Sequence, residues 1–573
     1  MADTGELRSR SWFGSAGKDG FIARHHLRAA GFSDTQFDGR PYVAIISTWS
    51  EMTPCNQNLR ALADHVKRGV LQAGGVPLEV PVMSLSEPLL RPTSMLYRNL
   101  TAMEVEEQIR AQPVDAAVLL TGCDKTTPAA LMGAASADVP SILLTGGPML
   151  NGKFRGQDVG SGTDIWRMSE DLRSGKISLA DFNEFETCLN RSAGHCMTMG
   201  TASTMACLAE ALGMTLPGAA ALPAPDSRRA VLAEQTGARA VEMALHGPQP
   251  HEVLTAAAFR NAVIVLAAIG GSTNAVLHLL AIAGRAGVNL SLDDIDTLGR
   301  DVPMLVDLMP SGRKLMEDFA YAGGVPSLLH ELAPLLDLDA ATVAGTPLKA
   351  AVGPASVDAD VIRTLDNPVQ PAGAAIAVLH GSLAPLGAVL KVSAATPELL
   401  QHTGPALVFD TLAEYMAVAD DPDLPVDKDT VLVVRNCGPK GYPGMPEVGN
   451  LPLPAKLLAQ GVNDMVRISD ARMSGTAFGT VLLHVAPESA AGGPLALVRT
   501  GDMVTLDVPA RRLDVMVDQD ELAHRAAAWT APPRASDRGW TRLYIDHVMQ
   551  ADQGVDLDFL VGSTDSKPPK VAF

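Results

Sequence analysis

The chain has 573 residues, 47% of them hydrophobic and 19% charged, so it is long enough for at least two domains with apolar cores of their own. Its formal net charge is −19, and no run of Lys and Arg alternates with aromatic residues, which argues against nucleic acid as a partner. No apolar run reaches the roughly 18 residues that span a bilayer, and the N-terminus lacks a secretory signal, so the sequence predicts a cytoplasmic protein with no membrane partner.

Short apolar runs alternate with helix-like segments along the first two thirds of the chain. An apolar run at 42–48 is followed by an amphipathic segment at 58–75 and by a second apolar run at 76–85. The same order recurs over residues 105–148. This alternation is typical of a parallel sheet covered by helices, so we expect an N-terminal α/β domain.

One of these runs ends in the polar stretch TGCDK, at residues 121–125. Two threonines and Pro128 follow it, a pattern that predicts a helix N-cap and a proline in the first helical position. Cys123, Asp124 and Lys125 should therefore lie in a loop at the carboxyl end of a strand, where open α/β sheets bind ligands.

Two further segments combine small or hydroxyl residues with an apolar periodic stretch. They lie at 194–213 and 270–287, the second with Ser272 or Thr273 as the expected cap. Helix N-termini of this kind present backbone N–H groups to anionic ligands. Neither segment has the glycine spacing of a nucleotide-binding loop, so nucleotide binding has little support.

The residue pattern of the sequence changes near residue 370. From there on, short runs rich in β-branched residues are bounded by glycine and proline. Such runs predict a smaller, β-rich and barrel-like domain. We therefore expect an α/β protein with two domains, an N-terminal parallel-sheet domain at 1–370 and a barrel-like C-terminal domain at 371–573.

Six short polar segments stand out against this apolar background. Taken singly, each has an ordinary interpretation as a turn or a solvated loop. Loops also carry a large share of binding and catalytic residues, and the spacing alone leaves open whether these segments meet in space. Their candidate site residues are Cys55, Glu87, Cys123, Asp124, Lys125, Cys196, Glu447, Ser474 and Thr476.

Several longer motifs are specific enough to carry a family resemblance. They include GCDKTTPA, GSGTDIWR, AGHCMTMGTASTM, GGSTNAVLH and GSLAPLGAVLK, spread along nearly the whole chain. In these motifs the sequence resembles the family of dihydroxyacid and sugar acid dehydratases. The versions GCDKTTPA and AGHCMTMGTASTM are similar to the branch that acts on pentonates and hexonates, and the sequence as a whole is most similar to members that act on L-arabinonate.

The resemblance implies an iron–sulfur cluster. Cys55, Cys123 and Cys196 would ligate it, and the sugar acid branch implies the 2Fe–2S type. Because three thiolates leave one iron with an open position, that iron can act as a Lewis acid toward a hydroxyl group. A cluster with four cysteine ligands would instead be expected to transfer electrons.

The resemblance also implies a Mg²⁺ ion. Glu87, Asp124 and Glu447 would hold it together with Lys125, whose amine would be carbamylated. Carbamylation turns a cation into an anion with oxygen donors, which suits a hard metal ion. The alternative is an unmodified Lys125 that forms a salt bridge with Asp124 or Glu87.

The activity implied by the resemblance is the dehydration of sugar acids to 2-keto-3-deoxy acids. Aldonic acids such as L-arabinonate, D-xylonate or D-gluconate would be the substrates. Ser474 would remove the C2 proton and Thr476 would help to hold it, while His195 and His278 are alternative bases. Family members form dimers or dimers of dimers, so a homodimer or homotetramer is implied.

Other functions remain open at the level of the sequence. One is dihydroxyacid dehydration in branched-chain amino acid synthesis, and another is a promiscuous enzyme that also accepts small acids such as glycerate. A hydrolase with Ser474 as nucleophile is a further class, although its segment lacks the GxSxG elbow. The last is a protein that kept the fold without catalysis.

The sequence departs from its relatives at two named positions. Many relatives have glycine where Ser86 stands, and those that act on L-arabinonate tend to have a smaller residue in place of His195. Both positions lie next to proposed ligands, so they bear on the choice of substrate.

Overall fold

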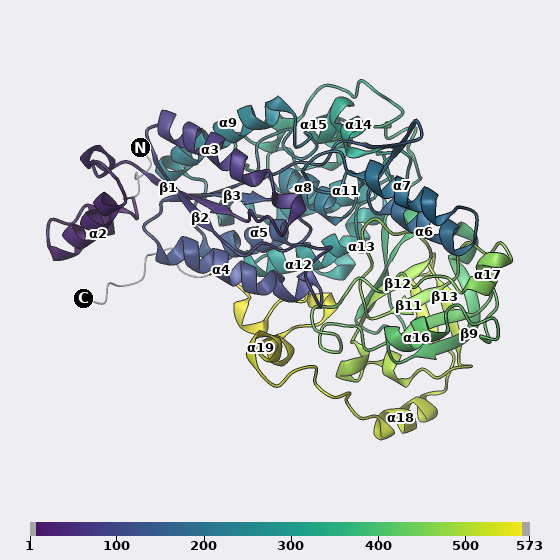
Figure 1. Ribbon diagram of the computed structural model, residues 1–573. Coiled ribbons are helices and arrows are strands. Elements are labelled where there is room, and N and C mark those ends of the chain that lie inside the picture. Colours follow the sequence, from purple (N-terminus) through teal and green to yellow (C-terminus); the bar gives the residue numbers. More distant parts are fainter. Residues whose placement is uncertain (1–6, 564–573) are drawn as a thin grey trace.

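The computed structural model describes residues 7–563, and a four-stranded sheet lies at the centre of its N-terminal part (Figure 1). The strands are β1 (Tyr42–Ser47), β2 (Val76–Pro81), β3 (Ala116–Thr121) and β4 (Ser141–Thr145), in the order β2-β1-β3-β4. All neighbouring pairs are parallel. The predicted parallel sheet is confirmed.

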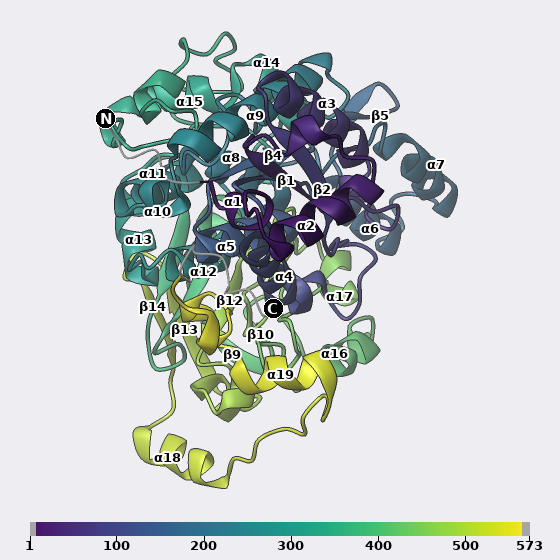
Figure 2. The same ribbon diagram turned by 90° about the vertical axis from the view of Figure 1, so that its left-hand side faces the viewer.

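This sheet is covered on both faces. Every residue of β1, β3 and β4 is buried, and such continuous apolar strands are typical of parallel sheets between two helical layers. The helices α3 (Leu59–Gln72) and α9 (Ser227–His246) cover one face (Figures 1 and 2). Helix α5 (Thr126–Ala137), with α4 (Arg98–Ala111) packed against it, covers the other.

Helix α5 begins two residues earlier than the sequence pattern predicts. Its N-cap residue is Lys125, and Pro128 is the third helical residue. The Thr126 hydroxyl group donates to the Cys123 carbonyl oxygen at 2.9 Å and accepts from the Gly122 N–H at 3.2 Å. The hydroxyl group therefore closes the preceding loop instead of capping the helix, and this fixes Cys123 and Lys125 relative to the strand end.

After β4 the N-terminal part is mainly helical, so the alternation of strands and helices ends earlier than predicted. The hairpin of β5 (Gly152–Phe154) and β6 (Gln157–Val159) is the only strand pair between β4 and residue 370. Helices α8 and α11 consist largely of small apolar residues that are buried on all sides, which favours helix packing over a further strand. Within residues 7–563, no helix is both long and apolar enough to cross a membrane. The main helices of this region are α6 (Thr163–Arg173), α7 (Leu179–Leu189), α8 (Thr201–Ala211), α11 (Ala256–Ala268), α12 (Asn274–Arg285), α13 (Leu292–Arg300), α14 (Met316–Tyr321) and α15 (Gly324–Leu332).

The C-terminal part is built on one eight-stranded sheet with the order β14-β13-β9-β10-β11-β12-β8-β7. Strands β9 to β12 are parallel, and the outer strands pair antiparallel. A bridge between His380, next to β7, and Arg512 in β14 brings the two edges together, so the sheet is nearly closed. The predicted barrel-like domain is confirmed. Its strands are β7 (Ile376–Leu379), β8 (Gly387–Lys391), β9 (Gln401–Phe409), β10 (Val431–Val434), β11 (Arg467–Ser469), β12 (Val481–Ala486), β13 (Met503–Asp507) and β14 (Arg512–Val515), and its helices include α16 (Leu412–Val418), α17 (Ala455–Ala459), α18 (Gln519–Ala528) and α19 (Gly539–His547).

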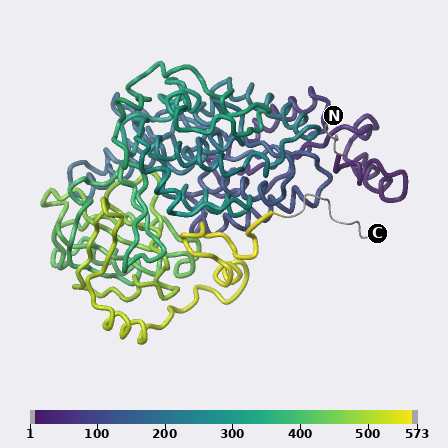
Figure 3. The backbone as a smooth tube through the Cα atoms, turned by 180° about the vertical axis from the view of Figure 1, so that it is seen from behind, coloured from purple at the N-terminus to yellow at the C-terminus, as the bar shows by residue number. Residues whose placement is uncertain are grey.

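The two parts of the molecule share an apolar core. Val378, Val389, Val481 and Leu483 of the C-terminal sheet belong to the same buried cluster as the N-terminal strands and helices. Figure 3 shows the C-terminal part, in green to yellow, gathered on one side of the molecule and directly against the N-terminal part. The division near residue 370 stays a prediction.

The C-terminal segment that follows α19 returns to the N-terminal part. The buried guanidinium group of Arg98 donates to the Gly554 carbonyl oxygen at 2.9 Å. Arg285 in α12 forms an ion pair with Asp556 at 2.6 Å. Because charges this deeply buried need partners, these contacts fix the segment against α4 and α12.

Helices α3 and α9 cross closely at two glycines. A Cβ atom on Gly237 would lie 2.2 Å from the Val66 carbonyl oxygen, and one on Gly69 would lie 1.9 Å from that of Glu234. We expect Gly237→Ala to lower the melting temperature by several degrees, because overpacking a core typically costs about 1–3 kcal/mol. Thermal unfolding followed by circular dichroism measures this shift. Gly284→Ala in α12 is the control, since its Cβ atom would meet nothing within 4 Å, and an equal drop there would contradict the explanation.

Candidate active site

Three neighbouring strands deliver polar groups to one edge of the N-terminal sheet. Cys55 follows β1, Glu87 follows β2, and Cys123 to Lys125 follow β3 directly. These strands are parallel and adjacent, so their carboxyl ends open on the same side of the sheet. The fold therefore brings together residues that lie far apart in the sequence.

A cluster of carboxylates surrounds the amine of Lys125. The lysine side chain is 0% exposed, and its Nζ atom lies 3.3 Å from Glu87 Oε2, 3.6 Å from Asp124 Oδ2 and 3.4 Å from Glu447 Oε1. Glu447 comes from the C-terminal part, so both parts of the chain complete this group. In the structure, Lys125 forms the salt bridges that the sequence offered as the alternative to carbamylation.

Two residues that the sequence reasoning did not single out hold Glu447 in place. Arg472 donates to Glu447 Oε1 at 2.7 Å, and Asn274 donates to the same oxygen at 2.7 Å. Arg472 also donates to Asn274 Oδ1 at 3.0 Å, and it is itself 0% exposed. Asn274 stands in the motif GGSTNAVLH, and Arg472 stands two residues before Ser474, but neither stretch of sequence indicates that the side chain points at Glu447.

Burial governs the protonation of these carboxyl groups. It raises the pKa of Glu447 to about 7, and the neighbouring charge of Glu87 adds to this effect. Burial also raises the pKa of Asp124. At Glu87 burial acts in the same direction, but the positive charges of Lys125 and Arg472 outweigh it and lower the pKa. Burial thus opposes the ionisation of these carboxyl groups, and the positive charges of Lys125 and Arg472 favour it.

The donor set suits a hard divalent cation, because three carboxylates converge on one point and oxygen is the ligand such ions prefer. The Lys125 ammonium group lies at that point and supplies the positive charge there. In residues 7–563, no three His, Cys, Asp or Glu side chains already stand together at metal-ligand positions. The three carboxylates therefore fit a metal site in their chemistry, with the Lys125 ammonium group between them.

Three thiols lie beside this cluster. The Cys55 thiol is hydrogen-bonded to Cys123, and Cys196 and Asp124 are close enough for their charges to act on it; this hydrogen bond and burial raise its pKa well above the usual range. The Cys123 sulfur accepts the Glu87 N–H at 3.4 Å. The thiol and carboxylate groups thus lie next to each other, and three gathered cysteines fit a metal or cluster that is bound by thiolates.

The remaining cysteines lie elsewhere. Cys207 is buried in α8 beside Glu210, and Cys437 is buried beside Asp470. Cys188 lies near the end of α7. The structure therefore brings together the three cysteines that the resemblance selected and keeps the other three apart from them.

The loop that carries Ser474 and Thr476 is wedged between helix starts of the N-terminal part. Ser474 Oγ and Thr476 Oγ1 lie 2.9 Å apart, and Trp166 Nε1 donates to Thr476 Oγ1 at 3.2 Å. A Cβ atom on Gly475 would lie 2.6 Å from Ser272 Oγ, and one on Gly162 would lie 2.2 Å from Thr476 Oγ1. Only glycine at these positions lets the loop approach so closely.

The two histidines considered as alternative bases are buried, and the Nδ1 atom of each contacts a group other than Ser474. His195 Nδ1 lies 3.1 Å from the Cys196 carbonyl oxygen, and burial lowers the pKa of His195 to about 4. His278 Nδ1 lies 3.1 Å from an Arg98 nitrogen, and burial lowers its pKa well below the usual range. Within the part of the chain that the structure describes, neither ring is hydrogen-bonded to Ser474.

Comparison with known proteins bears on this arrangement. A model of the N-terminal part of the dihydroxy-acid/6-phosphogluconate dehydratases matches residues 40–351, and a model of their C-terminal part matches residues 360–555. The chain belongs to this family. The resemblance inferred from the motifs is confirmed, and the protein is a hydro-lyase by family.

Similar proteins extend the match over the whole chain. L-arabonate dehydratase from Azospirillum brasilense is 57% identical over 573 residues, which cover 98% of each chain. L-arabinonate dehydratase from Rhizobium leguminosarum bv. trifolii is 56% identical and covers 97% of this chain and 96% of its own. 6-Deoxy-6-sulfo-D-gluconate dehydratase from Pseudomonas putida is 48% identical over 98% of each chain. These relatives are named for sugar acids, in agreement with the predicted branch.

Members of this family use metal cofactors. The carboxylate cluster around Lys125 and the three gathered thiols are two adjacent places in this chain whose chemistry fits such cofactors.

The contact between Gly162 and Thr476 leads to a test of the wedged loop. Gly162 has φ +85°, and a Cβ atom there would strike Thr476; Gly156 has φ +82°, but its Cβ atom would meet nothing within 4 Å. Both alanine substitutions impose similar backbone strain, so only the first should displace the loop. We expect Gly162→Ala to lower kcat by about tenfold or more, since small misplacements in an active site have large effects. Steady-state dehydration kinetics of both variants measure this, and equal losses would refute the role of the contact.

Proposed function

We propose that the protein dehydrates aldonic acids such as L-arabinonate, D-xylonate or D-gluconate and releases 2-keto-3-deoxy acids. The observation that carries the proposal is the buried carboxylate cluster around Lys125, with three thiols on one side and the hydroxyl pair of Ser474 and Thr476 in the same junction. The names of the similar proteins support sugar acids as the substrate class.

Glu87, Asp124 and Glu447 are the residues that would hold Mg²⁺, with Lys125 as a carbamylated fourth ligand. A carbamate would reverse the charge of Lys125 and add oxygen donors. When bound, the ion would supply positive charge that acidifies the C2 proton of the substrate and stabilises the enolate. Arg472 and Asn274 would keep Glu447 oriented toward it through their hydrogen bonds.

Cys55, Cys123 and Cys196 are the residues that would hold a 2Fe–2S cluster. Such a cluster would supply a Lewis acid for the departing C3 hydroxyl group. The Glu87 N–H would help to fix the Cys123 sulfur beside the carboxylates, because it already donates to that atom.

Ser474 is the proposed base. A serine hydroxyl is weakly basic at its ordinary pKa, so its alkoxide needs stabilisation by nearby donors and positive charge. Thr476 Oγ1 accepts from Trp166 Nε1 and lies 2.9 Å from Ser474 Oγ. While its oxygen accepts from the indole, the Thr476 hydroxyl group can donate its own proton to Ser474 and so stabilise the charged form.

The overall reaction removes one water molecule. Ser474 takes the C2 proton, the electrons of that bond form the C2–C3 double bond, and the C3 hydroxyl group leaves as water after gaining a proton. The resulting enol tautomerises to the 2-keto-3-deoxy acid. Assembly as a homodimer or homotetramer in the cytoplasm stays a prediction.

A turnover assay tests this function. Protein purified without oxygen and supplied with Mg²⁺ should form 2-keto acids from C5 and C6 aldonic acids. Ser474→Ala should lower kcat by about 10²–10⁴-fold, the usual contribution of a general base, and Thr476→Val by about tenfold or more, the effect of one hydrogen bond to a charged group. Product from 2,3-dihydroxyisovalerate alone would assign the protein to branched-chain amino acid synthesis. No product from any acid by iron-loaded protein would refute the proposal.

Metal analysis tests the proposed cluster ligands separately from turnover. We expect Cys123→Ser to lose most of its iron and acid-labile sulfide, because two remaining thiolates hold a cluster poorly. Cys188→Ser, at a cysteine near the end of α7, should keep the wild-type content. Iron and sulfide assays and the visible absorption spectrum measure this. Full iron in Cys123→Ser would remove this residue from the ligand set.

A further inference from the structure

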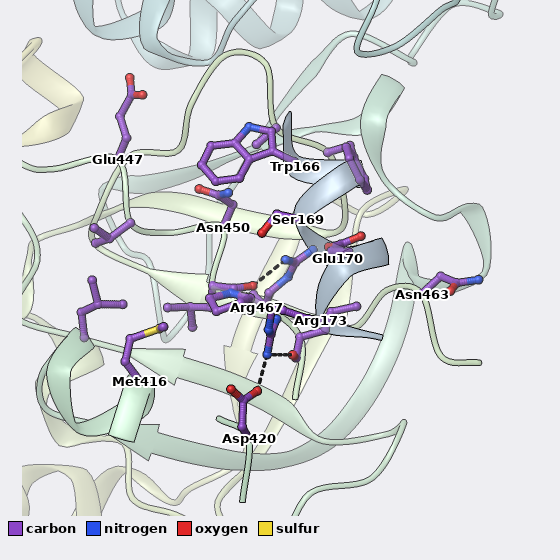
Figure 4. Close-up of a pocket in the computed structure, with 17 residues that line it drawn as sticks. Trp166, Ser169, Glu170, Arg173, Met416, Asp420, Glu447, Asn450, Asn463 and Arg467 are labelled. Carbon is purple, nitrogen blue, oxygen red and sulfur yellow. Dashed lines mark hydrogen bonds and ion pairs between the residues drawn. The ribbon is translucent and has the colours of Figure 1, made fainter. Parts of the chain in front are cut away.

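A cavity of about 360 Å³ opens beside Glu447, between helix α6 and the C-terminal part. Figure 4 shows Glu447 toward one end and Arg173 with Asp420 toward the other. The volume exceeds what a carboxylate and its two adjacent carbons require, so the cavity has room for a longer chain. Glu447, a proposed metal ligand, lies at one end of the cavity. A substrate bound at that ligand could therefore extend its unreactive carbons into the cavity.

Helix α6 forms one wall of this cavity. Trp166, Ser169, Glu170 and Arg173 line it, at the spacing that puts residues on one helical face. Trp166 also donates to Thr476 Oγ1, so the same wall touches the proposed catalytic pair. A ligand that reaches from the reacting carbons into the cavity must pass along this helix.

The two guanidinium groups of the cavity already have partners. Arg173 contacts Asp420 at 2.5 Å and the Leu453 carbonyl oxygen at 3.3 Å. Arg467 donates to Asp464 at 2.9 Å and to a backbone carbonyl oxygen at 2.9 Å. Each positive charge is thus offset by a carboxylate next to it, which leaves Glu170, within residues 7–563, as the charge of this wall without an ion-pair partner.

Glu170 differs from the other charged residues of the wall. In the described residues its carboxylate makes no hydrogen bond or ion pair, although Arg467 and Arg173 are near enough to act on it through their charges. The side chain is partly buried. An acceptor that is desolvated in this way is available to hydroxyl groups and repels other anions.

We propose that the cavity holds the hydroxylated tail of the substrate, from C4 onward, and that Glu170 selects a neutral tail over one that ends in a phosphate. This inference rests on the proposed function. Glu170 accepts hydrogen bonds from tail hydroxyl groups, with Ser169, Asn450 and Asn463 as further polar groups on the walls. A terminal phosphate would bring two negative charges toward a partly buried carboxylate that has no ion-pair partner among the described residues, which is unfavourable.

The test compares D-gluconate with 6-phospho-D-gluconate, which differ only at the end of the tail. Wild-type protein should bind D-gluconate more tightly. Glu170→Gln keeps the size of the side chain and removes the charge, so it should raise the ratio of phosphorylated to unphosphorylated affinity, and of kcat/KM, by about tenfold or more. Glu186→Gln, at an exposed residue of α7 outside the cavity, should leave both ratios unchanged.

Binding is measured by calorimetry with metal-loaded protein that carries Ser474→Ala, with and without the Glu170 substitution, so that turnover does not contribute to the heat. Equal wild-type affinities for the two acids, or a Glu170→Gln ratio within twofold of the wild-type ratio, would overturn the inference. Binding selectivity without turnover of either acid would instead count against the proposed function and leave the role of Glu170 supported. Circular dichroism checks that each variant is folded. Glu170→Ala is a second variant that should also relax the selectivity, so the result does not depend on Glu170→Gln alone.

Discussion

A buried lysine amine ties together parts of this chain that are hundreds of residues apart. Lys125 is fully enclosed, and it is surrounded by Glu87 and Asp124 from the N-terminal part and Glu447 from the C-terminal part. Removing one charge from such a group would leave the others buried without compensation, which is costly. The two parts of the molecule must therefore pack in one relative position, and the candidate active site exists only in that position.

The same junction places the hydroxyl pair of Ser474 and Thr476. Their loop belongs to the C-terminal part, but its neighbours are Gly162 and Ser272 of the N-terminal part, at the starts of helices α6 and α12. Glycine at 162 and 475 removes the side chains that would hold the surfaces apart. Close backbone approach thus fixes the position of the hydroxyl groups, and charge pairing fixes the position of the carboxylates.

Helix α6 serves two purposes in this arrangement. Its first turn closes on Thr476, and Trp166, one turn further on, contacts the Thr476 hydroxyl group while its ring faces the cavity. The helix then continues along the cavity toward Arg173 and Asp420. One helix would accordingly contact both the proposed catalytic hydroxyl pair and the substrate tail. The choice of substrate would then be coupled to its orientation.

The sequence by itself determined the fold class, the parallel sheet at 42–145, the barrel-like C-terminal part and the family, because hydrophobic periodicity is local and the motifs are long. It also picked out the cysteines and carboxylates as candidates, while their roles as ligands stay predictions. Where the strand pattern ends, how α5 begins, and the parts played by Asn274, Arg472 and Glu170 were decided only by the tertiary structure. Each of these depends on a partner far away in the chain, such as Glu447 for Arg472, and side-chain direction and burial between distant segments leave no periodic signal in a sequence.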